Sequence, residues 1–597
     1  MKKKKTYILG IGWHLCSSIA LVVDGKISYA ASEERFSRVK NDDNFPILAI
    51  KDCLRTFNIK IKDIDYFAIT SKFCPPASEL IKSMSRWGVA DYLKQQNKYW
   101  FPKIIEKKRG LDELKIMKKS FKIKDKYKKL LLNTFKGKNM DKNFIKRRKD
   151  FFSKILKVPK NKIYEIDHHT CHNFYSYFAS NFRNKKVLSL TMDGYGDGNN
   201  ATVNYFNEKS EYRNLSKINN CNLARLYRYV TLLLGMKPNE HEYKVMGLAP
   251  YGEKLKKFSK VYQILKNTMY VKGIGFKYKV IPKDYFFWFK KKFDGQRFDQ
   301  IAYGLQKYTE EIIFNWVKNC IRKFKIKNVV FSGGVSMNVK ANGKLLGIKE
   351  LKNLFVAGTG SDETLCFGAA IYLAKMKNVY NTSSNLFNLY LGPKTSSNEI
   401  QEINKLKNKK NYKIIKYKDH KIISKLLVKG YIFGRCVGRM EFGARSLGNR
   451  SIIADPKIPY ITNKINDAIK NRDFWMPFAP VILAEKSKKY LKKTIKAFSP
   501  HMTIAYETKA PAEIDMPACL HPKDKTARAQ ILRKNENKKF YELLSDFYSL
   551  TKRPCLMNTS FNLHGYPIVG NLKDAFYVFE NSKLDGLITD SYVILKT

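Results

Sequence analysis

The segment KIYEIDHHTCHNFYSYFASNFRNKKVLSLTMDG, residues 162–194, predicts a strand, a helix and a second strand that ends in a glycine turn. KIYEID and KVLSLTMDG have the aliphatic and aromatic residues that strands favour, and residues 169–180 between them have the length and apolar spacing of a helix. Strands that alternate with helices pack in layers. The segment therefore predicts an α/β fold.

The alternation continues on both sides of this segment. Toward the N-terminus, YILGIGW, SIALVV and KISYAAS predict a β-meander with Asp24-Gly25 as a hairpin turn, and a helix begins near Pro46. Toward the C-terminus, an amphipathic helix at 299–324 precedes the strands of NVVFSGGVSMN and NLFVAGTGS and a helix that ends near Lys377. The chain thus contains a second α/β series.

Two stretches depart from this pattern. Residues 378–398 contain many Asn and Ser and the sequence LGPKTS, which predicts a linker between a first domain at 1–385 and a second α/β domain at 390–597. Residues 72–160 are dense in Lys and Arg, with apolar residues at helical spacing. They predict a helical insertion with a basic exterior.

Composition restricts the class of protein. With 44% hydrophobic residues the chain is neither disordered nor fibrous, and 113 Lys and Arg against 52 Asp and Glu give a formal net charge of +61. That charge attracts nucleic acid, anionic membranes or phosphorylated small molecules, although AT-rich coding is the favoured explanation and nucleic acid is not the favoured partner. Ten scattered Cys without a CxxC pair predict a reducing cytoplasm. No apolar run is long enough for a membrane span, and the N-terminal run is too interrupted for a secretion signal.

A cluster of histidines points to a metal site. In DHHTCHNFYSYFAS, residues 167–180, the four-residue spacing of His168 and His172 places two imidazoles on one helix face, where they can bind one metal ion. Asp193 in LTMDG and Asp362 in GTGSDET follow strands beside glycine turns, where carboxylates face a crevice and can complete the site. Imidazoles suit iron, zinc, manganese or nickel. Capping or core roles for the histidines and turn roles for the aspartates are the alternatives.

Glycine turns point to a nucleotide. FSGGVSMN, residues 331–338, is a strand, a turn and a helix start, and its Gly333-Gly334 pair lets backbone N–H groups approach a phosphate. The turn lacks the GKS or GKT of a Walker loop. Together with the glycine-bounded aspartates it predicts nucleotide binding.

The C-terminal region contains arginines in a glycine-rich setting. GRMEFGARSLGNRSIIADP, residues 438–456, mixes them with glycine and apolar residues, which favours a lined pocket over a solvated basic surface. Guanidinium, amide and hydroxyl donors suit a phosphate or carboxylate ligand. The candidate donors are Arg439, Arg445, Arg450, Lys470, Arg472, Arg528, Asn558, Ser560 and Asn562.

These motifs, in order along the chain, resemble those of the ATP-dependent O-carbamoyltransferases of the nodulation-factor and antibiotic-tailoring type. The matching segments are VVDGKISYAASEERFSRVKND, DHHTCHNFYSYFAS, LTMDGYGDG, HEYKVMGLAPYGE, FSGGVSMNVKANGKL, GTGSDETLCFGAA, GRMEFGARSLGNRSIIADP and NTSFNLHGYPIV. Only about 72–160 matches poorly. The resemblance implies an actin-like ATPase domain (ASKHA) with duplicated α/β halves at 1–385, followed by a YrdC-like α/β domain at 390–597.

The resemblance also implies roles for residues. A metal at the nucleotide phosphates, Fe²⁺ before other ions, would be held by His168, His172, Asp193 and Asp362. ATP, bound with Mg²⁺, would be approached by Lys244, Gly333, Gly334 and Asn338. Carbamoyl phosphate would be bound by Arg445, Arg450, Lys470, Arg472, Arg528, Asn558 and Ser560.

The implied enzyme activates carbamoyl phosphate with ATP to carbamoyl-adenylate and transfers the carbamoyl group to a hydroxyl of a sugar, a glycan or a natural product. Three alternatives stay open: a hydroxymethylated DNA base as acceptor, a threonylcarbamoyl-type tRNA modification, and a catalytically inactive nucleotide-binding homologue. The insertion is either an acceptor-binding lid or, as favoured, a solvated appendage. A monomer and a homodimer fit the sequence equally well.

The first loop departs from the family pattern. The family commonly has His-Asp-Ser or His-Asn-Ala there, whereas this chain has His14-Leu15-Cys16-Ser17, so Leu-Cys replaces the aligned His-Asp pair. His14 lies one residue earlier and is the candidate base for the acceptor hydroxyl proton. A loop histidine without a catalytic role is the alternative. Lys525 in KDKTAR, where the family prefers glycine, is a lesser departure near Arg528.

Overall fold

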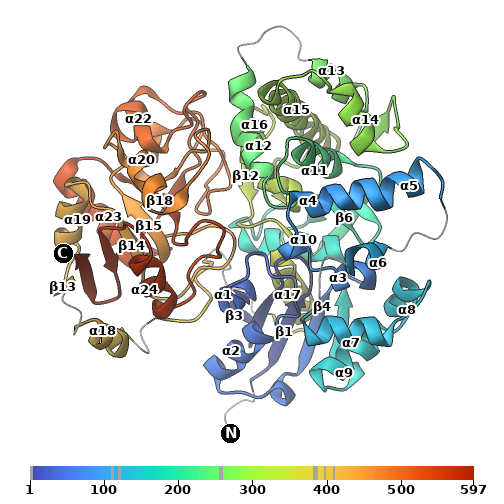
Figure 1. The fold of residues 1–597 in the computed structure, drawn as a ribbon, viewed down its shortest axis with the longest axis horizontal. Coiled ribbons are helices and arrows are strands. Elements are labelled where there is room, and N and C mark those ends of the chain that lie inside the picture. The colour runs from blue at the N-terminus through green and yellow to red at the C-terminus, as the bar shows by residue number, and fades with distance from the viewer. Residues whose placement is uncertain are drawn as a thin grey trace.

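Two five-stranded sheets of one topology form the N-terminal part of the computed structural model (Figure 1). The structure describes residues 5–108, 113–118, 123–253, 260–380, 388–395, 399–407 and 411–597. The first sheet has the order β3-β2-β1-β4-β5 and the second the order β8-β7-β6-β11-β12. In each, three consecutive strands form an antiparallel meander and the next two add in parallel beside its first strand. The two α/β series of the sequence thus fold into matching halves.

The strand bounds agree with the pattern of the sequence. The first sheet comprises β1 (Tyr7–Gly12), β2 (Ser18–Val23), β3 (Lys26–Ser32), β4 (Tyr66–Thr70) and β5 (Ile163–Ile166). The second comprises β6 (Val187–Gly196), β7 (Asn199–Phe206), β8 (Tyr212–Ile218), β11 (Asn328–Ser332) and β12 (Asn353–Val356), and a separate hairpin has β9 (Met269–Lys272) and β10 (Gly275–Tyr278). The meander and hairpin predicted at the N-terminus are confirmed.

A pair of helices, α10 (His168–Ala179) and α17 (Leu365–Met376), fills the space between the two sheets. Their side chains share one core with Ile8 and Ala68 of the first sheet and Val330 of the second. The helices approach closely at Gly368, where a Cβ would lie 1.8 Å from the carbonyl oxygen of Cys171. This packing brings the start of α10 beside the turn η7 (Asp362–Thr364) that precedes α17.

The remaining N-terminal helices surround this core. They are α1 (Glu34–Ser37), α2 (Ile47–Phe57), α11 (Leu223–Leu233), α12 (Glu242–Leu248), α13 (Lys260–Lys266), α14 (Tyr285–Lys292), α15 (Phe298–Phe324) and α16 (Val339–Leu345). The helices predicted near Pro46 and at 299–324 are confirmed.

The basic insertion is helical, as the sequence predicted. It forms α3 (Ala77–Ile81), η2 (Met84–Arg86), α4 (Val89–Gln95), η3 (Gln96–Trp100), α5 (Phe101–Ile104), α6 (Glu113–Lys118), α7 (Lys126–Thr134), α8 (Met140–Lys146) and α9 (Arg148–Leu156). One part packs on the first sheet, where Phe151 and Phe152 meet Trp13. Another part packs Trp87 and Tyr92 against Leu232 of α11. The insertion therefore packs against the rest of the N-terminal part at two places.

An eight-stranded sheet forms the C-terminal part, which lies to the left in Figure 1. Its strand order is β13-β20-β19-β14-β15-β18-β16-β17. The strands are β13 (Tyr412–Lys416), β14 (Phe433–Cys436), β15 (Arg450–Ala454), β16 (Ala479–Leu483), β17 (Gln530–Leu532), β18 (Cys555–Ser560), β19 (Gly586–Ile588) and β20 (Tyr592–Lys596). The helices are α18 (Glu399–Lys407), α19 (Lys421–Val428), α20 (Ile461–Ile465), α21 (Ser487–Tyr490), α22 (Ala510–Asp515), α23 (Lys538–Thr551) and α24 (Leu572–Glu580).

Direct hydrogen bonds join the two parts. The Arg35 guanidinium donates to the Gly443 carbonyl at 2.6 Å, and the Asn342 amide donates to the Thr503 carbonyl at 2.8 Å. The expected linker at 378–398 lies partly outside the described residues. Among the helices that the structure describes, none is both long enough and apolar enough to cross a membrane.

Candidate active site

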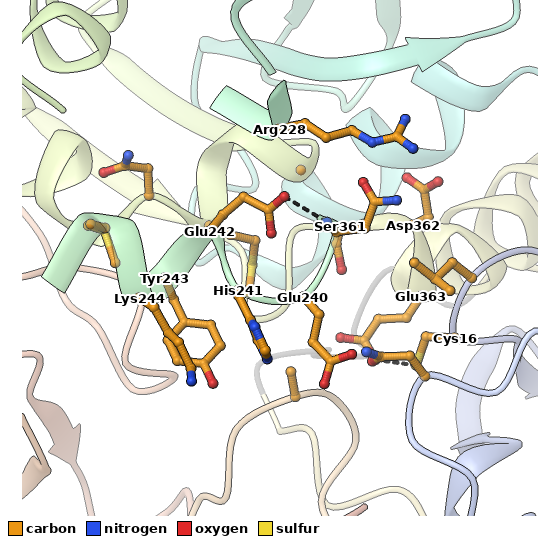
Figure 2. A pocket seen from close by; sticks show the side chains of 18 of the residues that line it. Cys16, Arg228, Glu240, His241, Glu242, Tyr243, Lys244, Ser361, Asp362 and Glu363 are labelled. Carbon is orange, nitrogen blue, oxygen red and sulfur yellow. Dashed lines mark hydrogen bonds between the residues drawn. The ribbon is translucent and has the colours of Figure 1, made fainter. Parts of the chain in front are cut away.

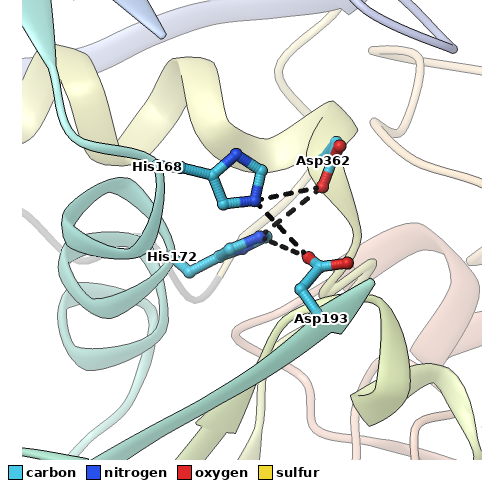
Figure 3. A group of neighbouring side chains, drawn as sticks. All are labelled: His168, His172, Asp193 and Asp362. Carbon is cyan, nitrogen blue, oxygen red and sulfur yellow. Dashed lines mark hydrogen bonds and ion pairs between the residues drawn. The ribbon is translucent and has the colours of Figure 1, made fainter. Parts of the chain in front are cut away.

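Four side chains converge where α10, β6 and η7 meet (Figure 3). Nε2 of His172 lies 3.0 Å from Oδ2 of Asp193 and 3.6 Å from Oδ1 of Asp362. Nε2 of His168 lies 3.6 Å from the same two oxygens. One ligand atom from each residue thus lies within 4.8 Å of the others. We call these four residues the His/Asp cluster.

Neighbouring groups orient the cluster. Asp167 caps α10 by accepting from the Thr170 N–H at 2.9 Å, which fixes the first turn of the helix. Nδ1 of His168 lies 3.0 Å from the Ser71 hydroxyl at the end of β4, so the second ring nitrogen is held as in known metal sites. Oδ2 of Asp193 also accepts from the Gly334 N–H at 3.1 Å. The turn that follows β11 is therefore tied to the cluster.

The charges of the cluster are complementary. Burial opposes protonation of His168, but Asp362 and Asp193 outweigh it and raise its pKa to about 9. Burial alone would raise the pKa of Asp193, whereas hydrogen bonds from His168 and His172 hold it well below its ordinary range. The two carboxylates thus favour the protonated form of His168. Two imidazole nitrogens and two carboxylate oxygens around one point fit a divalent transition-metal ion.

His169, between the two cluster histidines, serves a different purpose. Its Nδ1 lies 2.7 Å from the Thr191 hydroxyl and its Nε2 lies 3.2 Å from the Asn199 carbonyl, so both nitrogens are held within the fold. Burial lowers its pKa to about 4. It is a buried structural histidine.

The glycine turn after β11 approaches β6 closely. Gly333 has φ +91°, and a Cβ there would lie 2.3 Å from the carbonyl oxygen of Met192, so only glycine fits. Asn338, by contrast, caps α16 through the Ala341 N–H at 3.0 Å and exchanges hydrogen bonds with Gln306. Its side chain is engaged within the fold, so a direct nucleotide contact by that amide would require a rearrangement.

Lys244 bridges the two parts of the chain. Its Nζ lies 2.9 Å from Oδ2 of Asp473, on the segment that follows Lys470 and Arg472. The backbone carbonyl of the same lysine accepts from the Trp475 indole at 3.1 Å. Lys244 therefore fixes this C-terminal segment against α12.

Four cationic side chains of the C-terminal part gather at one place, the cationic cluster of Arg445, Lys470, Arg472 and Arg528. The ammonium of Lys470 donates to the Ser560 hydroxyl at 3.1 Å and to Oδ1 of Asn562 at 2.7 Å. Arg472 donates to the Thr559 hydroxyl at 2.8 Å.

Arg445 and Arg528 differ from these two, because they form no hydrogen bond or ion pair with any residue that the structure describes. Burial and repulsion by Arg445 and Arg472 hold the pKa of Arg528 well below its ordinary range, and burial together with Arg472 does the same for Lys470. Unpaired, mutually repelling cations beside hydroxyl and amide donors form a site for a multiply charged anion.

Two residues predicted for this pocket lie elsewhere. The Arg450 side chain is fully buried and donates to the Val437 carbonyl at 2.8 Å, so it braces the backbone before β15. Asn558 is buried beneath Ser446 and donates to the Gln530 amide oxygen at 2.7 Å. Neither residue is among those that line the cavity, so the structure places both side chains within the C-terminal fold.

Residues of both clusters line one cavity of about 970 Å³. Figure 2 shows part of its lining, including Lys244 and Asp362. From the N-terminal part it is lined by His14, His168, Asp193, Lys244, Gly334, Asn338 and Asp362. From the C-terminal part it is lined by Arg445, Lys470, Arg472, Arg528 and Ser560. His172 and Gly333 lie behind this wall. Residues that are distant in the sequence thus share a single chamber.

His14 faces this chamber with one nitrogen unengaged. Its Nδ1 lies 3.0 Å from the Leu15 carbonyl, which can only accept, so Nδ1 carries the proton in the neutral ring. Its Nε2 is buried without a hydrogen-bond partner. Gly12 makes room for the ring, since a Cβ there would lie 2.4 Å from Nε2. The ring is therefore a free base in the cavity wall.

The sequence did not single out Tyr243 or Glu363. Tyr243 of α12 lines the cavity and attracts Arg445 and Arg472 electrostatically. Glu363 accepts from the Cys16 thiol at 3.3 Å, so the departure in the first loop forms a thiol–carboxylate contact. Each is the sequence neighbour of a predicted site residue, Lys244 for Tyr243 and Asp362 for Glu363. That adjacency was the sequence feature that could have indicated them.

These features define a mixed α/β protein with a candidate metal centre and a candidate anion pocket in one cavity. Residues 7–371 match the sequence model for the carbamoyltransferase N-terminus, and residues 424–596 match that for the carbamoyltransferase C-terminus. The chain therefore belongs to the carbamoyltransferase family, and membership of this family implies that it is a transferase.

Relatives extend over the whole chain. Protein sll1178 of Synechocystis is 30% identical, over 99% of this chain and 97% of its own length. Nodulation protein NolNO of Sinorhizobium fredii is 28% identical, over 96% of this chain and 78% of its own. Full-length HypF in the phosphate- and nucleotide-bound form is a weak structural match, with 13% identity, a TM-score of 0.35 and coverage of 64% of this chain and 57% of that chain.

Proposed function

We propose that this carbamoyltransferase is ATP-dependent and acts in two steps within one cavity. The first step makes carbamoyl-adenylate at the cationic cluster, and the second transfers the carbamoyl group to an acceptor hydroxyl beside the His/Asp cluster. The observation that carries the proposal is the cavity of about 970 Å³ that both clusters line.

The cationic cluster suits the first step. Water hydrolyses carbamoyl phosphate to carbamate and inorganic phosphate. A carbamate oxygen then bonds to the α-phosphorus of ATP, and the bond from that phosphorus to the β-phosphate oxygen breaks to release pyrophosphate. Arg445 and Arg528 offer unpaired guanidinium groups to the phosphates, and filling the site relieves their mutual repulsion. Lys470 and Arg472, already held by hydrogen bonds, fix the geometry of the pocket.

His14 suits the second step. The acceptor oxygen bonds to the carbamoyl carbon, the bond from that carbon to the adenylate oxygen breaks, and AMP leaves. The free Nε2 of His14 takes the hydroxyl proton. Burial lowers the pKa of His14, so the ring is neutral and ready to accept a proton at pH 7.

A metal ion, when bound by His168, His172, Asp193 and Asp362, supplies positive charge next to the phosphate of the leaving AMP. Gly334 is tied to Asp193, so the backbone N–H groups of this turn lie beside the same phosphate-binding region. Iron remains our proposal for the ion, because imidazole nitrogens and carboxylate oxygens together suit it.

We infer the finer fold assignment from the topology. Two sheets of the same strand order around a central helix pair support an actin-like ATPase domain with duplicated halves, which we place at 1–385. The mixed eight-stranded sheet with its cationic cavity supports a YrdC-like domain at 390–597. The acceptor is a sugar, a glycan or a natural product in this proposal.

The experiment measures formation of AMP and pyrophosphate that depends on carbamoyl phosphate. We expect turnover by the unchanged protein and its loss in Arg445→Ala and Arg528→Ala. Lys534→Ala, an exposed residue beyond β17, is the matched control and should retain turnover. Absence of AMP formation with Mg²⁺, and with iron, manganese or zinc added, would contradict the proposal.

A further inference from the structure

Part of the cavity is lined by residues that belong neither to the cationic cluster nor to the His/Asp cluster. Its wall consists of α11, the turn after Asp193, and the first segment of the basic insertion. The residues of this wall are Leu80, Met84, Tyr195, Arg225, Tyr227 and Arg228. Of these, only Tyr195 belongs to the motifs that carry the family resemblance.

Two arginines of this wall lack a partner of opposite charge. Arg225 and Arg228 lie one turn apart on α11, so they share a helix face. Neither guanidinium group forms a hydrogen bond or ion pair with any described residue. The guanidinium of Arg225 lies over the Tyr195 ring at 5.7 Å, and that of Arg228 lies over the Tyr92 ring at 5.7 Å. Aromatic faces thus hold both cations while their N–H donors stay available.

The carboxylates nearby are mostly engaged elsewhere. Glu240 pairs with Lys40 and Lys237, and Glu242 accepts from the Asn239 N–H at 2.7 Å. Figure 2 shows both glutamates in the cavity lining. Asp43 pairs with the buried Lys128. Glu79 is exposed and Glu242 attracts Arg228 electrostatically, but no carboxylate of the described residues lies within ion-pair distance of either arginine.

The wall also adjoins the site of transfer. Gly194 follows the cluster residue Asp193, and a Cβ at Gly194 would lie 3.9 Å from the Cβ of Ala224, next to Arg225. Tyr195 follows directly and is 47% exposed, which is unusual for an aromatic ring beside a buried cluster. A molecule resting on Tyr195 would present its hydroxyl groups to the cluster.

We propose that this wall is the acceptor subsite and that the acceptor is a hydroxyl compound bearing an anionic group, a carboxylate or a phosphate, which Arg225 and Arg228 bind. This inference rests on the proposed function, because only a transferase of that kind has an acceptor as its second substrate. The ring of Tyr195 supports the body of the molecule, and the insertion contributes through Tyr92 beneath Arg228. The poorly matching insertion thereby helps select the acceptor.

The test is equilibrium binding by calorimetry with three probes: glucuronate, glucose 6-phosphate and glucose. Saturating pyrophosphate fills the cationic cluster, so the probes report on the remaining wall. The unchanged protein should bind at least one anionic probe about tenfold more tightly than glucose, since charge-assisted hydrogen bonds are worth that much. A preference for glucuronate identifies a carboxylate-bearing acceptor, and one for glucose 6-phosphate identifies a phosphate-bearing acceptor.

The double variant Arg225→Gln/Arg228→Gln should lose this preference, whereas Arg213→Gln, an exposed arginine on β8, should keep it. Equal binding of glucose and both anionic probes by the unchanged protein would overturn the subsite, and so would a preference that survives in the double variant. AMP formation by the unchanged protein is measured separately. The proposed function and the subsite can therefore fail independently.

Discussion

The two clusters that share the cavity handle charge in opposite ways. In the His/Asp cluster each imidazole has a carboxylate within 3.6 Å, so groups of opposite character already face one another. In the cationic cluster, Arg445 and Arg528 repel each other electrostatically. Among the described residues, no carboxylate forms an ion pair with either guanidinium group. The first site is balanced before a ligand arrives, and the second becomes balanced only when an anion binds.

This difference separates the chemistry of the two sites. A balanced site with converging nitrogen and oxygen atoms can exchange its shared proton for a metal ion. In a cationic site without paired carboxylates, the fold holds the cations close together despite their repulsion, and bound phosphates reduce that repulsion. Such a site suits a reaction step in which negative charge develops on phosphate groups.

The largest effect is expected at His14, which lines the cavity near Asp362, His168 and His172. His14→Gln should lower carbamoyl transfer by roughly 10²–10⁴-fold, as expected for loss of a general base. AMP formation in the absence of acceptor should change far less. A transfer rate in the variant that equals that of the unchanged protein would assign His14 to the loop structure.

The same residue sets a pH dependence. Burial lowers the pKa of His14 below its ordinary value of 6.5, so transfer should hold steady as pH falls to 6.5 and decline only at lower pH. The unfolded chain binds this proton before the folded one does, so His14 also makes folding less favourable below pH 6.5. In His14→Gln, the decline of the transfer rate at low pH that arises from protonation of His14 should be absent from the pH–rate profile.

A slightly smaller effect is expected at the unbalanced cluster. Arg445→Ala or Arg528→Ala should lower carbamoyl-phosphate-dependent AMP formation by about 10²–10³-fold, because each removes a donor aimed at developing charge. Metal content, measured by elemental analysis, should stay unchanged. Loss of metal in these variants would show that the two clusters do not act separately.

The balanced cluster should respond more mildly to changes around it. Ser71→Ala removes the group that orients His168 and should weaken metal binding by about 10–100-fold. Competition with a chelator measures this affinity, and Ser78→Ala, whose hydroxyl bonds Asp141 instead, is the matched control. Equal affinities in the two variants would contradict the orienting role.

The smallest effect on turnover is expected at Asn558. Asn558→Ala should lower the free energy of unfolding by about 1–3 kcal/mol, since its buried partners Gln530 and Ser446 lose a hydrogen bond. Turnover of the folded variant should be close to normal. Denaturant titration and AMP formation together separate this structural role from a role in the pocket.

Local spacing predicted much of this molecule. The interval between His168 and His172 fixes them on one face of α10, and glycine turns after strands mark Asp193 and Asp362, so the balanced cluster follows from short segments. The strands of both halves were predicted for the same reason, because alternation and apolar runs are local properties.

The cationic cluster was predicted less well because its geometry depends on tertiary packing. Arg445 and Arg450 are alike in the sequence, yet one lines the cavity and the other braces the backbone before β15. Asn558 and Ser560 share a face of β18, but Ser446 covers only the former. The arginines of α11 had no motif around them, since the insertion that completes their wall is distant in sequence.

The most direct test of the account mixes two variants, Arg445→Ala, which should not make carbamoyl-adenylate, and His172→Ala, which should not transfer it. Transfer to an acceptor is measured for each variant alone and for an equimolar mixture. If the intermediate passes through the cavity that both clusters line, the mixture should remain as inactive as its components. Recovery of transfer in the mixture toward half the rate of the unchanged protein would show that carbamoyl-adenylate travels through solvent, and would contradict the shared cavity as the route.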